Sequence, residues 1–385
     1  MIFSAKIFCA AAIFIALLNL SGKEGVEKEN EPVQEIEEIS EVGKLESFIK
    51  KFTPTADVRL RYQVESWRRD WGEGTETRNR DRLRIRVRAG LAFDPIDRLR
   101  IYARLSTGNL TMGSDNFGDG PNQEVAAYFD DYWVEGKPFS FLTIRAGGYS
   151  APFANSTLIW HPNWRVTGIN ENFRFSLGNH LLYVNATQIV YREGSWTEGK
   201  NIFKSDTQLF VQKAGIDLNF MDRLKIAPSA TFHIYTNNMN SENLGLSAAD
   251  DERHHYRLFN PSLDIVWSFS KRLPLKLYGD VVYNLGASEE NIAYEVGAVL
   301  GRTREQFDFS LAFYYRNADL FSIDPNTSTD QLPTGLRVNS DAFHAAAGIA
   351  LFDFWVLQAE FYHGKPKDGS EQHYTNFHIN NTFRY

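Results

Sequence analysis

Apolar and polar side chains alternate along much of this chain, and this period of two limits what the chain can fold into. The first alternating segment starts near residue 56, and its apolar members are Val58, Leu60, Tyr62 and Val64. The residues between them are Asp57, Arg59, Arg61, Gln63 and Glu65. Successive side chains of a β-strand point to opposite faces of a sheet. The segment therefore predicts a strand with one apolar and one charged face.

The next two segments repeat this alternation and are rich in arginine. The apolar series of the second segment is Leu83, Ile85, Val87, Ala89, Leu91 and Phe93, and its arginines are Arg82, Arg84, Arg86 and Arg88. A turn at residues 94–97 separates it from the third segment. There the apolar series is Leu99, Ile101, Ala103 and Leu105, opposite Arg98, Arg100, Tyr102 and Arg104. Three neighbouring strands are thus predicted to share one basic face.

Thirteen further segments with strand character follow. They are residues 124–136, 139–149, 172–177, 180–192, 207–220, 223–235, 258–269, 273–285, 292–301, 307–316, 341–351, 354–363 and 374–385. Short turns are predicted at 94–97, 137–138, 178–179, 221–222, 270–272, 302–306 and 352–353, and the loops between them are mostly long. Short turns at one end and long loops at the other are typical of an outer-membrane barrel. We expect an all-β, transmembrane, antiparallel up-and-down β-barrel of about 16 strands over residues 53–385.

Hydropathy excludes a helical membrane protein for the part of the chain after residue 53. No apolar run there approaches the roughly 20 residues that a spanning helix requires. The strands of a barrel escape this criterion because their lipid-facing and lumen-facing residues alternate. The formal net charge of −7 gives no indication of nucleic acid as a partner.

Two segments precede the predicted barrel. Residues 1–22 have the character of a secretory signal peptide, because Lys6 precedes an apolar run that ends in small residues. The single cysteine, Cys9, lies in that run, so cleavage would leave no thiol. Residues 23–52 are acidic, with apolar residues spaced three or four apart, which predicts a helix. We expect a periplasmic helical segment or tether, and a short oligomerising coiled coil is the alternative.

Aromatic residues support insertion of the barrel into an outer membrane. They recur near the predicted strand ends, where interfacial belts form in membrane proteins. The chain ends with Phe377, Ile379, Asn381, Phe383 and Tyr385 at alternate positions. This pattern resembles the C-terminal strand signal of outer-membrane barrels.

Several stretches of the chain resemble the putative-porin families of Gram-negative bacteria, which are related to general and anion-preferring diffusion porins. The stretches are 78–86, 144–148 with Pro152 and Phe153, 158–160 before Gly168, 277–284, and 294–301 followed by 313–316. The likeness covers roughly residues 55–385. It implies a passive pore in the outer membrane, in contact with lipid and lipopolysaccharide, that passes small hydrophilic solutes. It also implies a homotrimer and no cofactor, whereas the acidic segment has no counterpart in the common porin pattern.

Nine arginines are predicted to line the pore if the apolar faces meet lipid. They are Arg59, Arg61, Arg82, Arg84, Arg86, Arg88, Arg98, Arg100 and Arg104. The opposite register would cost about 2–4 kcal/mol for each arginine near the bilayer midplane. A basic ladder in a narrow channel concentrates anions, so an anion preference is one hypothesis. The alternative is that acids such as Asp57, Glu65, Asp130, Asp131 and Asp308 balance the ladder and leave little net selectivity.

A constriction loop is expected at residues 150–171, since in the porins that this chain resembles the loop at this place folds inward and narrows the channel. Its candidate residues are Phe153, Trp160, His161, Trp164 and Arg165. Aromatic rings there either stack on solutes or buttress the wall. The loop is nearly free of carboxylates, unlike the acidic constriction loop of many general porins.

No sequence motif of an enzyme or a metal site appears, and we expect neither catalysis nor a metal centre. Residues 115–120 and 250–255 are acidic stretches that fit solvated loops better than metal sites. Asp130 and Asp131 are adjacent, and neighbours on a regular strand point to opposite faces. Two further functions remain open: a substrate-specific channel for acidic oligosaccharide or phosphate, and a plugged barrel that serves as a structural anchor or adhesin.

Overall fold

The computed structural model describes residues 43–70, 75–108, 115–116, 126–192, 207–221, 223–236, 256–328, 331–333 and 336–385. The predicted signal peptide and most of the acidic segment lie outside these residues. The chain divides into two units, Met1–Lys50 and Lys51–Tyr385. In the first, residues 43–49 form a short exposed helix, in agreement with the helix predicted there. No helix in the described ranges is long and apolar enough to cross a membrane.

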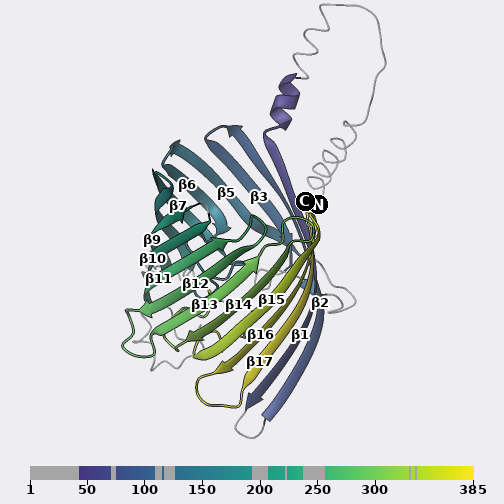
Figure 1. Ribbon diagram of the computed structural model, residues 1–385, viewed down its shortest axis with the longest axis vertical. Helices are drawn as coiled ribbons and strands as arrows, with labels where there is room; N and C mark the ends of the chain where they lie inside the picture. Colours follow the sequence, from purple (N-terminus) through teal and green to yellow (C-terminus); the bar gives the residue numbers. More distant parts are fainter. Residues whose placement is uncertain are drawn as a thin grey trace, which may run out of the picture. The chain divides into compact units, whose positions relative to one another are not determined.

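The second unit is a closed antiparallel sheet (Figure 1). Its strands are β1 (Phe52–Asp70), β2 (Thr75–Ile96), β3 (Leu99–Thr107), β4 (Asp115–Asn116), β5 (Ala127–Phe139), β6 (Leu142–Ser150), β7 (Arg165–Leu177), β8 (His180–Arg192), β9 (Thr207–Phe220), β10 (Leu224–Tyr235), β11 (Arg257–Ser268), β12 (Pro274–Asn284), β13 (Ile292–Gly301), β14 (Phe309–Ala318), β15 (Ser340–Phe352), β16 (Trp355–Pro366) and β17 (His373–Arg384). β1 pairs with both β2 and β17, which closes the barrel.

The prediction of 16 strands is confirmed, because β4 has only 2 residues and the other strands form the barrel wall. β4 pairs with β2 beside the end of β3. Several predicted boundaries are wrong. The strands expected at 124–136 and 139–149 are β5 and β6, so the turn between them lies at 140–141 and not at 137–138. The strand expected at 172–177 begins at Arg165, as β7, and has 13 residues.

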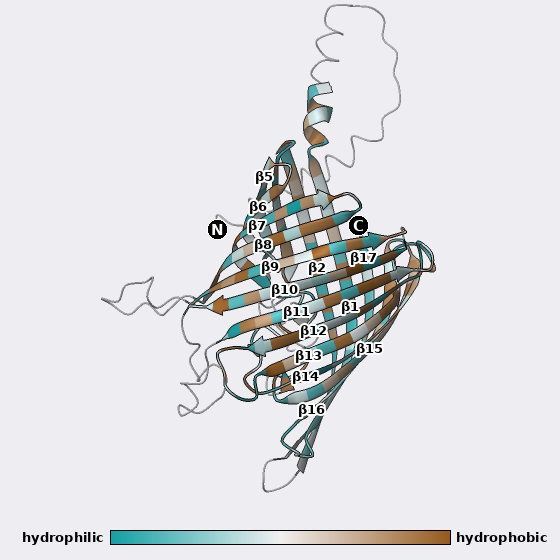
Figure 2. Ribbon diagram, turned by 60° about the vertical axis from the view of Figure 1, so that its left-hand side comes forward, coloured by the Kyte–Doolittle hydropathy of each residue, from teal (hydrophilic) through white to brown (hydrophobic). Residues whose placement is uncertain are grey.

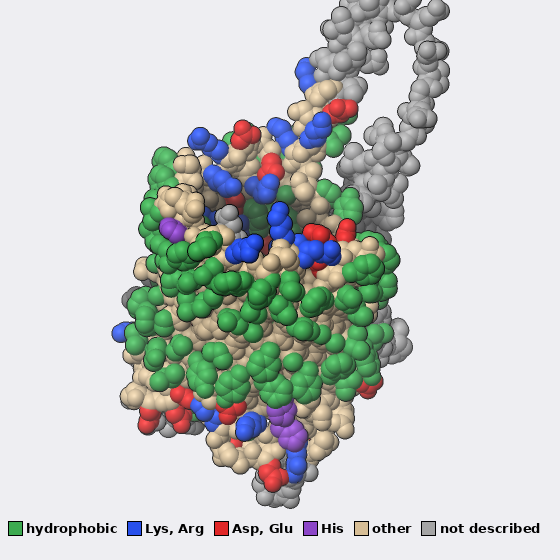
Figure 3. Space-filling model, in the orientation of Figure 1, with side chains coloured by type: hydrophobic (Ala, Val, Ile, Leu, Met, Phe, Trp, Pro, Cys, Tyr) green, Lys and Arg blue, Asp and Glu red, His purple; other side chains and the backbone are tan. Residues whose placement is uncertain are grey.

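The two faces of the wall follow the alternation that the sequence predicted. On β1, Leu60 and Tyr62 are 37% and 43% exposed, whereas the alternate residues Arg61 and Gln63 are 6% and 3% exposed. Apolar and polar residues succeed each other along the strands (Figure 2). Figure 3 shows a continuous band of hydrophobic side chains around the visible face, with charged side chains at both ends. The outer surface is thus suited to hydrocarbon and the inner surface is polar.

The short and long connections lie at opposite ends of the barrel, as predicted. Residues 97–98, 140–141 and 178–179 are examples of the short turns that join consecutive strands. The first and last strands end beside each other at the end with the short turns, where Tyr385 N donates to Ala56 O over 2.8 Å. In an outer-membrane barrel this end faces the periplasm.

Candidate functional site: the barrel lumen

The segment at residues 151–164, between β6 and β7, folds into the barrel and is bonded to the wall on the far side. Asn155 Nδ2 donates to Ser262 Oγ over 2.7 Å, and Ser156 Oγ donates to Asp280 Oδ2 over 2.5 Å. Thr157 Oγ1 donates to Glu295 Oε2 over 3.0 Å. We call this segment the inward loop. It ends at Trp164, and not at residue 171 as expected, because β7 starts at Arg165.

The predicted aromatic residues of the inward loop pack against the wall. Phe153, Trp160 and His161 are buried. The ring of Phe153 meets those of Trp160 and His233 edge to face, with centroids 5.5 and 5.4 Å apart. Trp164 packs against the same hydrophobic cluster. These rings buttress the loop and present little surface to a passing solute.

A second segment, which was not predicted from the sequence, also fills part of the lumen. Residues 319–339 join β14 to β15, and Phe321 to Pro325 are all buried. Thr327 connects this segment to the inward loop: its hydroxyl donates to Ile159 O and its carbonyl accepts from His161 N, both over 2.8 Å. An unusually apolar loop, with Leu320, Phe321 and Ile323, was the signal that could have revealed it.

The second segment also reaches the opposite side of the wall. Leu332 and Leu336 cluster with Ala342 and Tyr374, and Trp67 packs against them. The rings of Trp67 and Tyr374 meet edge to face at 6.1 Å. The described parts of residues 319–339 therefore contact the inward loop and β1, β15 and β17.

Most of the predicted pore-lining arginines form one wall of the lumen, over β1, β2 and β3. Arg59 lies directly opposite Arg86 on the neighbouring strand, and Arg61 lies directly opposite Arg84. Like charges directly opposite each other destabilise a sheet. Two predicted members belong elsewhere. Arg98 is an exposed residue of the turn at 97–98, and Arg100 lies near that end of the barrel, bound to Asp94 over 2.7 Å.

Carboxylates and amides pair with several of these arginines. Arg82 contacts Glu65 at 2.6 Å, and Arg88 contacts Asp57 at 2.7 Å. Arg61 Nε donates to Asn380 Oδ1 over 2.6 Å, in the register that β1 shares with β17. The wall is therefore partly neutralised, but arginines outnumber the carboxylates that contact them.

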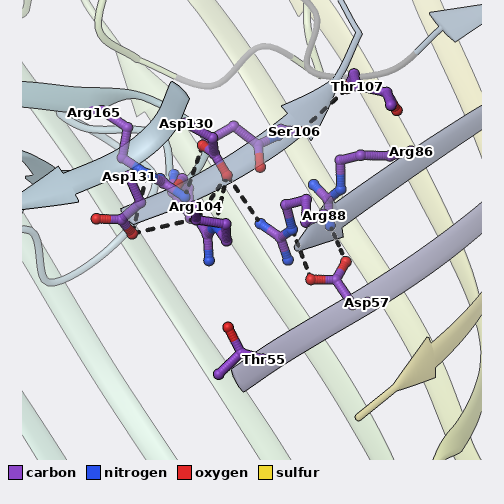
Figure 4. Close-up of polar contacts among 12 residues, drawn as sticks. Thr55, Asp57, Arg86, Arg88, Arg104, Ser106, Thr107, Asp130, Asp131 and Arg165 are labelled. Carbon is purple, nitrogen blue, oxygen red and sulfur yellow. Dashed lines mark hydrogen bonds and ion pairs between the residues drawn. The ribbon is translucent and has the colours of Figure 1, made fainter. Parts of the chain in front are cut away.

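Asp130 and Asp131 point to the same face, which corrects the expectation that they diverge. β5 carries one extra residue opposite the Arg104–Leu105 step of β3, so its alternation is interrupted at Asp130. The two side chains are 9% and 11% exposed, and both contact Arg104 Nη2, at 2.6 and 3.3 Å. Figure 4 shows these side chains converging with Arg88 and Arg165.

Arg165 joins this cluster to the inward loop. Its guanidinium lies 3.4 Å from Asp130 and 3.7 Å from Asp131, and its Nη1 donates to Pro162 O over 2.7 Å. From the sequence, Arg165 was expected to belong to the loop. It is the first residue of β7, and from there it fixes the end of the loop to the arginine-bearing wall of β1, β2 and β3. We call this wall the basic wall.

A cavity of about 450 Å³ lies against the basic wall. Its charged side chains are those of Arg59, Arg86, Arg88, Arg104, Arg384, Asp57 and Glu360. Neutral donors and acceptors complete the lining, among them Thr55, Tyr102, Gln358, Asn380 and Thr382. We call this space the basic cavity. Five guanidinium groups and two side-chain carboxylates line it. Asp130 and Asp131, outside the lining, pair with Arg104, so the excess of positive charge is smaller than the lining alone gives.

Among the described residues, no group of three or more His, Cys, Asp or Glu side chains could hold a metal ion. The acidic stretch at 250–255 and residues 117–120 lie outside the described part of the chain. Asp115 and Asn116 form β4.

Comparison with known proteins supports the resemblance to porins. A family model described as "Putative porin" matches residues 72–254, which confirms the resemblance over that part of the chain. No curated protein matches the sequence.

Solved outer-membrane proteins share the fold. OprB of Pseudomonas putida, in its high-pH structure, is 11% identical with a TM-score of 0.57, and the match covers 90% of this chain and 97% of that chain. OmpF of Salmonella typhi, in complex with daunomycin, is 10% identical with a TM-score of 0.52, covering 87% and 97%. The outer membrane channel DcaP of Acinetobacter baumannii is 11% identical with a TM-score of 0.50, covering 87% and 97%. At such identities the likeness establishes the fold alone.

Proposed function

We propose that this protein is an outer-membrane channel through which small hydrophilic solutes diffuse passively, with a preference for anions. The observation that carries the proposal is a polar barrel lumen with a basic cavity lined by five arginines and two carboxylates. Guanidinium groups keep their charge at any physiological pH, and fixed charge in a narrow aqueous channel raises the local concentration of counter-ions. The match to the porin family model supports the same reading. It favours a channel over an enzyme.

The inward loop strengthens the argument for anions. Residues 151–164 contain no Asp, Glu, Lys or Arg. The acids that face the loop, Asp280 and Glu295, accept hydrogen bonds from Ser156 and Thr157. The loop therefore shields those carboxylates, and the arginines of the opposite wall dominate the field in the remaining lumen.

Osmotic swelling of liposomes tests the channel itself. Liposomes that contain the refolded full-length protein should swell when a small neutral sugar such as arabinose replaces an impermeant solute outside. Liposomes prepared with heat-denatured protein are the control. Swelling at the rate of the control would contradict the proposal.

A plugged barrel with an anchoring role is the second candidate, and one observation favours it. Residues 151–164 and the described parts of residues 319–339 occupy the lumen and contact each other through Thr327. A folded protein that shows neither swelling nor single-channel conductance would support this alternative.

The family resemblance leads to three further proposals: export by a cleaved signal peptide at residues 1–22, insertion among lipid and lipopolysaccharide, and assembly as a homotrimer. Mass spectrometry of the mature chain tests the first. Light scattering of the detergent-extracted protein tests the trimer, and a monomeric mass would contradict it.

A further inference from the structure

We propose that the basic cavity is a saturable binding site for a phosphorylated sugar, a solute with a doubly charged phosphate group and several hydroxyl groups. The inference deepens the proposed function, on which it rests in one respect: the solute must reach the cavity through the lumen. It goes beyond a general anion preference because it assigns a single site and a ligand class. Four observations carry it, and each concerns residues that line the cavity.

The first observation is the placement of two arginines that repel each other. Arg59 and Arg86 line the cavity from directly opposite positions on β1 and β2. When no ligand lies between them, two like charges at directly opposite positions destabilise a sheet. A doubly charged anion that lies between the two guanidinium groups would turn this repulsion into two attractions.

The second observation is an unused donor. Arg86 is 8% exposed, and its Nε–H has no hydrogen-bond partner in the described part of the chain. Among the described residues, its ion contact with Asp57 is long, at 3.5 Å. Buried donors in proteins are nearly always bonded. The Nε atom itself is enclosed, but the guanidinium of Arg86 lines the cavity, so a phosphate oxygen there would supply the close anionic partner that Asp57 does not.

The third observation is that the two carboxylates of the cavity are already engaged. Asp57 accepts a hydrogen bond of 2.7 Å from Arg88. Glu360 accepts bonds from Tyr362 over 2.5 Å and from Asn380 over 2.6 Å. These partners hold the carboxylates in place, and Asp130 and Asp131 pair with Arg104, so the positive field of the cavity comes mainly from Arg59 and Arg86. A charge of −2 matches this excess better than the single charge of a carboxylic acid.

The fourth observation concerns the neutral side of the cavity. Gln358 on β16 and Thr382 on β17 line it and are partly exposed. An amide and a hydroxyl are the groups that recognise sugar hydroxyls. A volume of about 450 Å³ also lies within the range of small-molecule sites, which is roughly 300–1,000 Å³.

Isothermal titration calorimetry on the refolded full-length protein in detergent tests the site without requiring conduction. The probes are glucose 6-phosphate, inorganic phosphate and glucose, at low ionic strength. We expect saturable binding of glucose 6-phosphate, weaker binding of inorganic phosphate and no binding of glucose. Arg86→Gln should weaken glucose 6-phosphate binding about tenfold or more, since a bond between charged groups is lost. Arg98→Gln, an equal change at an exposed turn, should leave binding unchanged.

The outcomes separate this inference from the proposed function. Absence of saturable binding, or equal losses in the Arg86→Gln and Arg98→Gln variants, would overturn the site. Inorganic phosphate that binds as tightly as glucose 6-phosphate would overturn the sugar part of the assignment. If Arg86→Gln does not fold, Gln358→Ala provides a second test, because it should reduce the advantage of glucose 6-phosphate over phosphate. Swelling without binding would refute the site alone, whereas binding without swelling would refute the channel alone.

Discussion

The hydroxyl group of Thr157 donates a hydrogen bond of 3.0 Å to Oε2 of Glu295, although the two residues are 138 positions apart in the chain. This bond joins the inward loop to β13, on the other side of the barrel from the strands that carry the loop. Ser156 makes the neighbouring bond to Asp280 on β12. The position of the loop, and with it the shape of the lumen, therefore depends on a few polar contacts with buried carboxylates.

Removal of these contacts should loosen the loop. We expect the double variant Ser156→Ala, Thr157→Val to lose about 3 kcal/mol of stability, because two hydrogen bonds to carboxylates disappear. In planar bilayers its open-channel current should be noisier than that of the wild-type protein. Ser176→Ala, on β7 outside the loop, is the control. Equal noise in all three proteins would show that these bonds do not hold the loop.

Asp324 should make the docking of residues 319–328 depend on pH. Burial raises the pKa of this carboxyl group to about 6, while the Tyr191 hydroxyl donates a hydrogen bond to it. A pKa raised in the docked state means that docking binds a proton. Docking should be strongest below about pH 4 and should weaken as the pH rises through 6.

Hydrogen exchange of residues 319–328 measures this effect. Exchange should be slower at pH 4 than at pH 7, after correction for the intrinsic pH dependence of the rate. The Asp324→Asn variant should remove the difference, because its side chain cannot ionise. A wild-type protein with the same corrected protection at both pH values would contradict the account.

Gly147 on β6 should tolerate no side chain. Its φ of +130° is unfavourable for other residues, and a Cβ atom would lie 2.2 Å from Tyr132 O. We expect Gly147→Ala to destabilise the barrel by roughly 2 kcal/mol or more, as measured by urea unfolding in lipid vesicles. Gly136→Ala is a matched control on β5, since nothing lies within 4 Å of a Cβ there. Equal stabilities of the two variants would show that a Cβ atom at position 147 causes no strain.

Arg59 should lower the free energy of unfolding of the barrel while it contributes to the preference for anions. Neutralising it in Arg59→Gln removes the repulsion from Arg86 directly opposite. We expect the free energy of unfolding to rise by roughly 0.5 kcal/mol, while the preference for anions decreases. The same unfolding assay and a reversal-potential measurement test the two effects. A variant that is less stable than the wild type would show that Arg59 has a structural role.

The alternation of side chains was sufficient to predict the barrel, its strand number and its lipid-facing register. It failed where residues inside the lumen pack against the wall. Val166, at the start of β7, is a buried member of the hydrophobic cluster formed with the inward loop. Ile169, three positions later, is 50% exposed on the outer face. Apolar residues on both faces hide the period of two, so the first half of this strand was read as loop.

The local sequence pattern could not predict the bulge at Asp130 or the inward position of the second segment. The bulge is defined by the pairing of β5 with β3, and only that pairing brings both carboxylates to Arg104. The described parts of residues 319–339 contact Tyr191, Ile159 and Tyr374, which are distant in the sequence. The candidate site was predicted as a row of arginines on β1, β2 and β3, but the cavity is also lined by Gln358 of β16 and by Asn380 and Thr382 of β17.

The reversal potential of the refolded protein in a planar bilayer, under a gradient of KCl, tests the central claim most directly. The account predicts stable open steps and a reversal potential that favours chloride. The Arg59→Gln, Arg86→Gln double variant should shift this potential towards zero. Open steps with a potential at zero or favouring potassium in the wild-type protein would contradict the anion preference of the basic wall.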